Sequence, residues 1–159
     1  MAFDYFLRID GIPGESMDAK HKGEIPVHTF SWGESQTPAP VSGGGGGAGK
    51  VNIEDLHVTT PTSKAGPLLM LACASGQHIK AAVLSARRAG KQPGDFLTFS
   101  LSDVLISDYH IAGAAEQPPT DSVSLRFGRI EIEYKEQKAD GTLGGDVKQK
   151  YSFSKNVKI

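Results

Sequence analysis

The feature of this sequence that most restricts its fold is an alternation of apolar and polar side chains with a period of two, which recurs along most of the chain. In the first segment, FDYFLRI at residues 3–9, every second position is apolar. Successive side chains of a β-strand point to opposite faces, so this period is typical of half-buried strands. With about seven or eight such segments, the sequence predicts an all-β barrel or two-sheet sandwich. The further predicted strands are Glu24–Trp32, Val51–Thr59, Ile79–Arg87, Asp95–Leu101, Val104–Ile111, Ser122–Glu136 and Val147–Lys155.

One segment departs from the alternation. Residues 67–75, PLLMLACAS, are rich in strong helix formers and predict a single short α-helix. Gly66 is expected at the N-cap, Pro67 at the first helical position and Gly76 just beyond the end. The leucines cover enough of the circumference to predict burial against the sheets, with a neighbouring subunit as a second contact. The predicted helix-packing residues are Leu68, Leu69, Leu71 and Ala72.

The long strand near the C-terminus contains a change of parity. Its apolar residues hold odd positions up to Phe127 and even positions from Ile130 onward. We interpret this slip as a β-bulge at Gly128-Arg129. Residues 139–145, ADGTLGG, supply Asp-Gly turn chemistry and predict a hairpin between this strand and the last one.

Residues 36–50, QTPAPVSGGGGGAGK, combine prolines with five consecutive glycines and predict a long protruding loop. Within it, GGGGAGK satisfies the G-x-x-x-x-G-K part of a phosphate-binding loop. That motif requires a Ser or Thr next and a helix whose amides hold phosphate, whereas Val51 begins an alternating, strand-like segment. A flexible interaction loop is the favoured interpretation.

Charge and composition narrow the function classes. Lysine and arginine total 17 against 18 acidic residues, a net charge of −1, so neither nucleic acid nor a membrane surface is an expected partner. No run of apolar residues is long enough for a membrane span, and the charged N-terminal segment does not resemble a signal peptide. Cys73 is the single cysteine, which excludes an internal disulfide. The length predicts one domain, residues 1–159.

Chemistry-bearing residues form no convincing site in the sequence. The five histidines are scattered and only Cys73 could join them as a soft ligand, so no metal or cofactor is predicted. Ser16 and Ser75 lie outside any nucleophile-elbow motif and are expected in turns or caps. Glu131 and Glu133 alternate with apolar residues, as on a solvated or interface face. No catalytic residue is predicted.

Several blocks in sequence order resemble one protein family. They are FDYFLRIDGIPGESMDAKHKGEI, SWGESQ, GGGGGAGKVNIEDL, PLLMLACASGQHIKAAV, VLISDY and IEIEYKEQKADGTLGG. Together they are similar to the haemolysin-coregulated protein (Hcp) family of type VI secretion, with Gly66 in place of an expected serine cap. The resemblance implies a phage tail-tube-like barrel with one helix, forming hexameric rings. Such rings stack into a hollow tube that a contractile sheath expels, and they carry small effectors in the lumen.

The resemblance also implies sites, partners and a location. Ser31, with Thr29 on the same strand face, is expected on the lumen wall in contact with effectors. The partners implied are other copies of the chain, a spike protein, the sheath and effectors. Assembly is expected in the cytoplasm and export through type VI secretion without a signal peptide. Since the sequence ends directly after the last predicted strand, no C-terminal toxin extension is expected. The residues of the glycine-rich loop expected to contact a neighbouring subunit or ring are Ser42, Gly43, Gly44, Gly45, Gly46, Gly47, Ala48, Gly49 and Lys50.

Two other function classes stay open at this point. One is a monomeric β-sandwich binding module, which size-exclusion chromatography distinguishes from a ring. The other is an enzyme, either a phosphate-loop nucleotide-binding protein or a hydrolase fused to a tube domain. The missing Ser or Thr after Lys50 and the missing extension both count against it.

Overall fold

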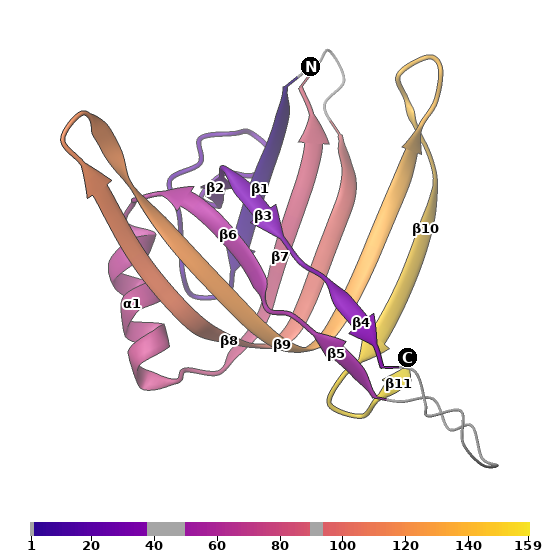
Figure 1. Cartoon of the computed structure of the whole chain (residues 1–159). Helices are drawn as coiled ribbons and strands as arrows, with labels where there is room; N and C mark the ends of the chain where they lie inside the picture. The colour runs from indigo at the N-terminus through magenta and orange to yellow at the C-terminus, as the bar shows by residue number, and fades with distance from the viewer. Residues whose placement is uncertain (1, 38–49, 90–93) are drawn as a thin grey trace.

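The computed structural model describes residues 2–37, 50–89 and 94–159. It is dominated by one antiparallel sheet with the path β11-β10-β9-β8-β7-β1-β2, which β6 and then β3 join from the side of β9. A separate ribbon pairs β4 with β5. The elements shown in Figure 1 are β1 (Phe3–Ile9), β2 (Ile25–Val27), β3 (Thr29–Ser31), β4 (Glu34–Gln36), β5 (Val51–Ile53), β6 (Leu56–Pro61), α1 (Ala65–Ser75), β7 (Ile79–Arg88), β8 (Asp95–Ala114), β9 (Gln117–Gln137), β10 (Leu143–Ser152) and β11 (Val157–Lys158). The predicted β-rich fold with one short helix is confirmed.

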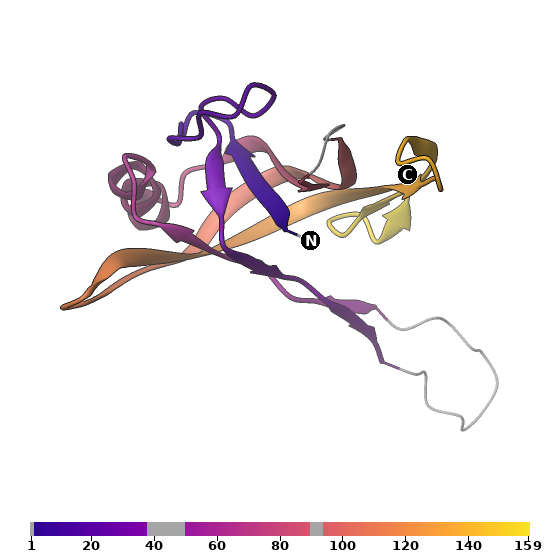
Figure 2. The same cartoon turned by 90° about the horizontal axis from the view of Figure 1, so that it is seen from above.

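The two longest strands organise the sheet. β8 has 20 residues and β9 has 21, and they pair with each other along nearly their whole length. On its other edge, the first half of β9 pairs with β6 and the second half pairs with β10. The sheet therefore divides at β9, and Figure 2 shows the β4–β5 ribbon extending away from the main body on the β6 side.

The core lies on one face of this sheet, where alternate residues are apolar. In one row across β3, β6 and β9, Phe30 faces Val58 and Val58 faces Val123. Val58 and Val123 are buried, and Phe30 packs against the same core. Helix α1 lies beside β8 (Figure 1) and adds Leu69 and Ala72 to this core.

The prediction of a continuous strand over Glu24–Trp32 is wrong. The segment breaks at His28, because β2 pairs with β1 whereas β3 pairs with β6. Ile25 and Val27 are consequently buried, while Thr29 and Ser31 are exposed. The side chains at odd positions do not share one environment along the segment.

Other strand boundaries also differ from the sequence prediction. Residues 95–101 and 104–111 belong to one strand, because Asp103 adopts a positive φ of 56° without ending the pairing. Residues 51–59 instead divide into two strands. The short strands β4 and β11 were not predicted. The predicted C-terminal hairpin is confirmed: β9 and β10 pair antiparallel, with Gly141 at a φ of 86° in the turn.

The parity change in β9 is real, but a bulge at Gly128-Arg129 is the wrong explanation. Residues on both sides of Gly128 keep the same register with β8. β8 changes parity at the facing position: Leu101 and Val104 are both buried although they are three residues apart. A Cβ on Gly128 would lie 3.3 Å from that of Asp103. The apolar side chains of β8 and β9 thus change to the other parity at the same paired position, Asp103 and Gly128. The register between the two strands therefore needs no extra residue there.

The helix begins earlier than predicted. α1 starts at Ala65, whose N–H donates to Ser63 Oγ at 3.2 Å, so Gly66 is a buried residue of the first turn and not the N-cap. A Cβ at Gly66 would meet the Tyr109 hydroxyl at 3.1 Å. The predicted end at Gly76 is confirmed, with a left-handed φ of 63°.

The predicted packing of the helix is half right. Leu69 is 1% exposed and Ala72 is fully buried, which confirms their contact with the sheet. Leu68 and Leu71 are 39% and 57% exposed, so the prediction that they pack against the sheets of their own chain is wrong. An 11-residue helix lying on a sheet can bury only one stripe, and these two residues point away from it. Their contact with a neighbouring subunit stays a prediction.

Candidate functional site

The exposed side of the β3-β6-β9-β8 sheet carries two rows of small polar and histidine side chains. Residues directly opposite one another in paired strands share a face. One row joins Thr29, Thr59, Ser122 and His110, and the next joins Ser31, His57, Ser124 and Asp108. We call these eight residues the hydroxyl face. The apolar row through Phe30 and Val58 lies between them on the opposite, core side, as alternation requires.

The hydroxyl face contains a shallow hollow of about 550 Å³ in which neighbouring strands are already joined by side-chain hydrogen bonds. Thr29 Oγ1 and Thr59 Oγ1 lie 2.6 Å apart. His57 Nδ1 lies 2.6 Å from Ser124 Oγ. Thr29, Ser31 and His57 are exposed, so their remaining donor and acceptor positions face solvent.

A charged pair lies at one end of the hollow. Ser107 donates its hydroxyl to Asp55 Oδ2 at 2.6 Å, and Arg126 Nε donates to Asp55 Oδ1 at 3.3 Å. Ser107 is the extra residue where the register between β8 and β9 shifts by one. This arrangement can form hydrogen bonds with a polar ligand.

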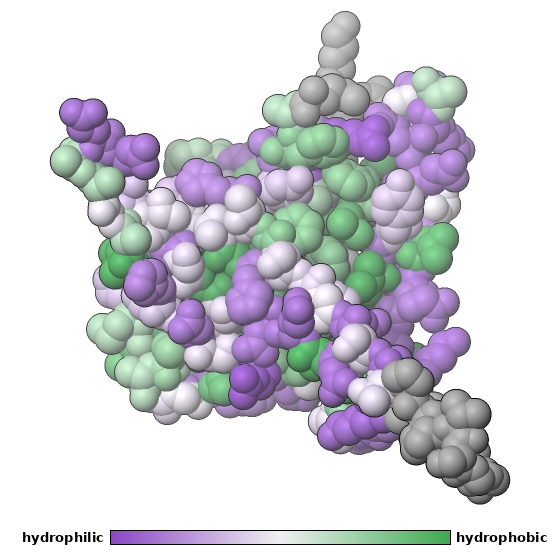
Figure 3. Space-filling view, viewed as in Figure 1, coloured by the Kyte–Doolittle hydropathy of each residue, from purple (hydrophilic) through white to green (hydrophobic). Residues whose placement is uncertain are grey.

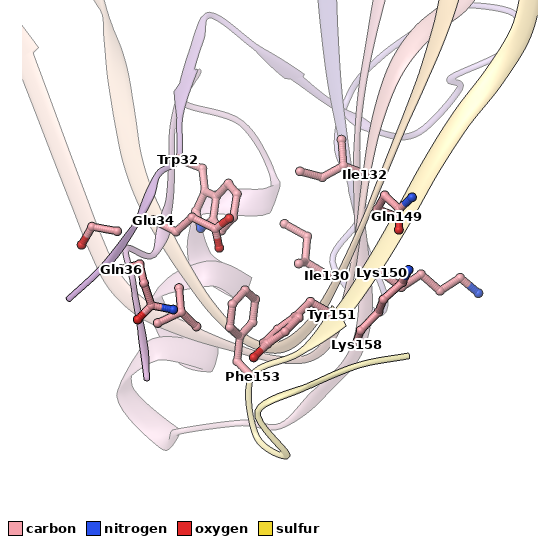
Figure 4. Close-up of a pocket in the computed structure, with 12 residues that line it drawn as sticks. Trp32, Glu34, Gln36, Ile130, Ile132, Gln149, Lys150, Tyr151, Phe153 and Lys158 are labelled. Carbon is pink, nitrogen blue, oxygen red and sulfur yellow. The ribbon is translucent and has the colours of Figure 1, made fainter. Parts of the chain in front are cut away.

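A second concave region has a different character. A groove of about 610 Å³ lies between the β4–β5 ribbon and the β9–β10 hairpin. Trp32, Ile130, Tyr151 and Phe153 project into it in Figure 4, and Figure 3 shows apolar surface in this hollow. Trp32 is fixed by donating its indole N–H to the carbonyl of Glu54 at 2.8 Å. The groove can receive an apolar segment of another chain.

The charged face of the β9–β10 hairpin agrees with the sequence interpretation of Glu131 and Glu133. Lys148 Nζ lies 3.5 Å from Glu131 and 3.0 Å from Glu133, and Lys150 Nζ lies 3.5 Å from Glu131. The hydrogen bond to Glu133 raises the pKa of Lys148. These carboxylates are paired across the strands, as expected of a solvated or interface face.

The remaining residues predicted from the sequence lie in different parts of the structure, and some lie outside the described residues. Ser31 and Thr29 lie together on the hydroxyl face. Lys50 is exposed immediately before β5, and Ser42–Gly49 lie outside the described residues. The strand expected after the GGGGAGK motif is confirmed as β5. Ser16 Oγ accepts from the N–H of Asp18 and Ser75 Oγ donates to the carbonyl of Leu71, the local roles expected of both.

Sequence reasoning missed the partners of Ser31. His57 and Ser124 alternate with buried valines and leucines in their own strands; His57 is exposed, whereas Ser124 is buried beside it. Only the strand pairing brings them beside Ser31.

Within residues 2–37, 50–89 and 94–159, no cluster of three or more potential metal ligands occurs. In the same ranges, no helix is both long and apolar enough to span a membrane.

Comparisons with known proteins agree on one family. The family described as "Type VI secretion system effector, Hcp" matches residues 6–134. The chain is 42% identical to Protein hcp1 of Pseudomonas aeruginosa over 160 residues, covering 99% of both sequences. The crystal structure of Hcp1 from Salmonella typhimurium superposes with a TM-score of 0.81 at 34% identity, covering 100% of both chains. A structure titled as a type six secretion system protein gives a TM-score of 0.92 at 28% identity, over 99% of this chain and 100% of the other.

Proposed function

Because this chain belongs to the Hcp family of the type VI secretion system, we propose that it forms hexameric rings that stack into the hollow tube exported by that system. The family is one of secreted structural tube proteins and not of enzymes. We further propose that residues 1–159 act as one tube domain, assembled in the cytoplasm and then expelled with its cargo. The implied partners are further copies of the chain, the spike, the sheath and small effectors.

The unpaired edges of the sheet support assembly. Among the residues that the structure describes, β2 forms one end of the strand path, β10 is covered at the other end only by the two-residue β11, and β3 pairs only with β6. Unpaired backbone groups at such edges favour pairing with another chain, and closure around a ring can pair them. Native mass spectrometry of the purified protein should give the mass of a hexamer. A monomer at tens of micromolar would favour a binding module instead.

The hydroxyl face is the observation that carries the proposed lumen wall. A wall that contacts cargo through polar groups needs exposed donors and acceptors. The rows through Thr29 and Ser31 offer hydroxyl and imidazole groups, and both residues are exposed in the single subunit. We propose that Ser31 contacts effectors directly and that Thr29, held by Thr59, shapes the wall beside it.

Ser31→Gln tests this assignment. The longer side chain projects from an exposed position, so the subunit should fold and rings should form normally. Repetition around the ring would crowd the lumen from every subunit, so effectors that need the lumen for protection should decline in the cell. Ser75→Gln, on the exposed end of α1, is the matched control and should leave effector levels unchanged. Intact Ser31→Gln rings with normal effector levels would refute the lumen assignment, and broken rings would indicate an interface role.

The glycine-rich loop is a separate part of the proposal. We propose that residues 42–50 contact a neighbouring subunit or ring, since their composition gives them little use in the core of their own chain. Shortening the glycine run should impair assembly while the subunit stays folded by circular dichroism. Normal assembly and secretion of the shortened variant would show that the loop is only a spacer.

A further inference from the structure

A cluster of charged groups unrelated to the hydroxyl face fastens the segment between β1 and β2. This segment, residues 10–24, folds back on itself: the N–H of Gly14 donates to the carbonyl of Gly23 at 2.8 Å. The N–H of Ser16 likewise donates to the carbonyl of Glu24 at 2.9 Å. We call residues 10–24 the β1–β2 loop. It presents His21 toward β1 and β8, where the side chain is buried.

Both nitrogens of the His21 ring face carboxylate oxygens. Nδ1 lies 2.9 Å from Glu24 Oε2, and Nε2 lies 2.9 Å from Asp95 Oδ1 at the start of β8. An ionised carboxylate can only accept hydrogen bonds, and a neutral imidazole has only one N–H. Both contacts are hydrogen bonds only when His21 carries two ring protons. The geometry therefore selects the imidazolium form.

The aromatic and charged surroundings favour the same form. The His21 ring stacks on Phe6 of β1, with centroids 4.4 Å apart and planes 8° from parallel. Burial lowers the pKa of His21, but the hydrogen bonds to Asp95 and Glu24 offset this, so the pKa is raised above its ordinary 6.5. The result is a buried cation that lies between one carboxylate of its own loop and one of the sheet.

The second cation of the cluster is Arg87, which stays charged over a wider pH range than His21 does. Arg87 of β7 holds Asp18 of the loop with both terminal nitrogens, Nη1 donating to Oδ2 at 2.8 Å. Its Nε lies 3.6 Å from Asp4 of β1, and its guanidinium lies 4.9 Å from the centre of the Phe6 ring. The hydrogen bond from Arg87 lowers the pKa of Asp18 to about 2, and the same contact raises the pKa of Arg87. This pair stays ionised around neutrality.

We propose that His21 is a protonation-controlled clasp, which holds the β1–β2 loop on β1 and β8 while doubly protonated and releases it on losing a proton. After deprotonation, one ring nitrogen would present its lone pair to Glu24 or Asp95, and that partly buried carboxylate would lose its hydrogen-bond donor. Since the folded-state pKa is raised, this stabilisation is complete below the ordinary histidine pKa and is lost as the pH rises through the raised value. The Arg87–Asp18 pair would keep the loop tethered at Asp18.

Release of the loop would affect the edge of the sheet. The loop leads directly into β2, the terminal strand of the path, and the carbonyl of Glu24 accepts from Ser16 at its base. If this edge takes part in ring contacts, which rests on the proposed function, then alkaline pH would weaken assembly. The clasp itself does not depend on assembly and can be measured in a single subunit.

The experiment combines hydrogen exchange of residues 10–24 with NMR titration of His21 in the full chain. Exchange is measured from about pH 5.5 to about pH 8.5. Within that range, the equilibrium constant for opening of the loop should rise about tenfold per pH unit between the ordinary histidine pKa and the raised pKa of His21. His21→Gln should be open at both pH values and show no such dependence after correction for intrinsic exchange rates. His78→Gln removes an exposed histidine–carboxylate contact, 3.3 Å from Asp103, and should behave like the wild type.

Two results would overturn the proposal, and both come from the wild-type protein. One is a His21 pKa at or below the ordinary histidine value. The other is unchanged protection of the loop on both sides of the measured pKa. Native mass spectrometry under the same conditions separates the clasp from assembly: loop opening in a chain that never forms rings would support the clasp and refute the proposed function.

Discussion

Leu69 and Leu71 offer a direct test of how α1 is attached to the sheet. They lie two residues apart in the same helix, yet Leu69 is 1% exposed and Leu71 is 57% exposed. Truncation of each to alanine removes the same atoms and barely changes helix propensity. The difference between Leu69→Ala and Leu71→Ala therefore measures burial alone.

The expected magnitudes follow from those exposures. Leucine-to-alanine substitution removes three carbon atoms, each worth about 0.8 kcal/mol when fully buried. For Leu69 nearly all of this is lost, and the cavity left against the sheet brings the cost to about 3–4 kcal/mol. For Leu71 less than half of the side chain is covered, so the cost is about 1 kcal/mol or less. In a domain of this size, the first change should lower the Tm by about 6–16 °C and the second by a few degrees.

Urea denaturation and thermal melting of the unassembled subunit measure both changes, with equal m-values as the check that unfolding is comparable. Equal losses for the two variants would refute the placement of the helix stripe. Leu71→Asp sharpens the test: the subunit should fold normally because the charge meets solvent. If this variant folds but forms no rings, Leu71 contacts a neighbour.

Four further substitutions probe other parts of the fold. Gly14→Ala should destabilise the subunit by at least about 2 kcal/mol in urea denaturation, because its Cβ would lie 2.5 Å from the carbonyl oxygen of Glu24. Gly76→Ala should cost only about 1 kcal/mol by the same measurement, since the space is open and only the left-handed φ of 63° is strained. Stability should also fall as the pH drops from about 4 toward 2, because the lowered pKa of Asp18 gives stabilisation that is complete only above its ordinary value of 3.8. Asp18→Asn should remove that part of the acid dependence, and an unchanged profile would show that Asp18 does not contribute. Asp121→Ala should cost about 2 kcal/mol, since the buried carboxylate accepts from Thr62 Oγ1 at 2.8 Å.

Local alternation was sufficient to predict most of the longer strands, because burial of one face repeats every second residue, but it did not predict the short strands β4 and β11. It was not sufficient to predict which strands pair. In residues 24–32 the apolar side chains move from odd positions, Ile25 and Val27, to even positions, Phe30 and Trp32. The chain changes partner between them at His28, and the new partner is β6, nearly thirty residues later. The error at Gly128 has the same origin, since the matching change at Asp103 lies in a different strand.

In the candidate site, too, local sequence predicted the residues of one strand but not the residues that strand pairing brings beside them. Ser31 and Thr29 were predicted from the family resemblance, and their own strand placed them on one face. His57 and Ser124 were not predicted, because their position beside Ser31 depends on the registers of two strand pairs. The exposed Leu71 was misjudged because a helix that is apolar all round gives no indication of which stripe meets the sheet.

Because β6 pairs with β9, the sheet cannot be completed until β9 has been synthesised. Leu56 pairs with Leu125, and a ribosome adding about 5–20 residues per second needs roughly 3–14 s to pass from one to the other. During that interval β3 and β6 can pair only with each other, and an isolated two-stranded unit is marginally stable in water. The rows that include Thr29 and Ser31 are therefore finished only after β9 has emerged. A nascent chain does not yet have this face, so the contact with effectors that we propose would begin with the finished subunit.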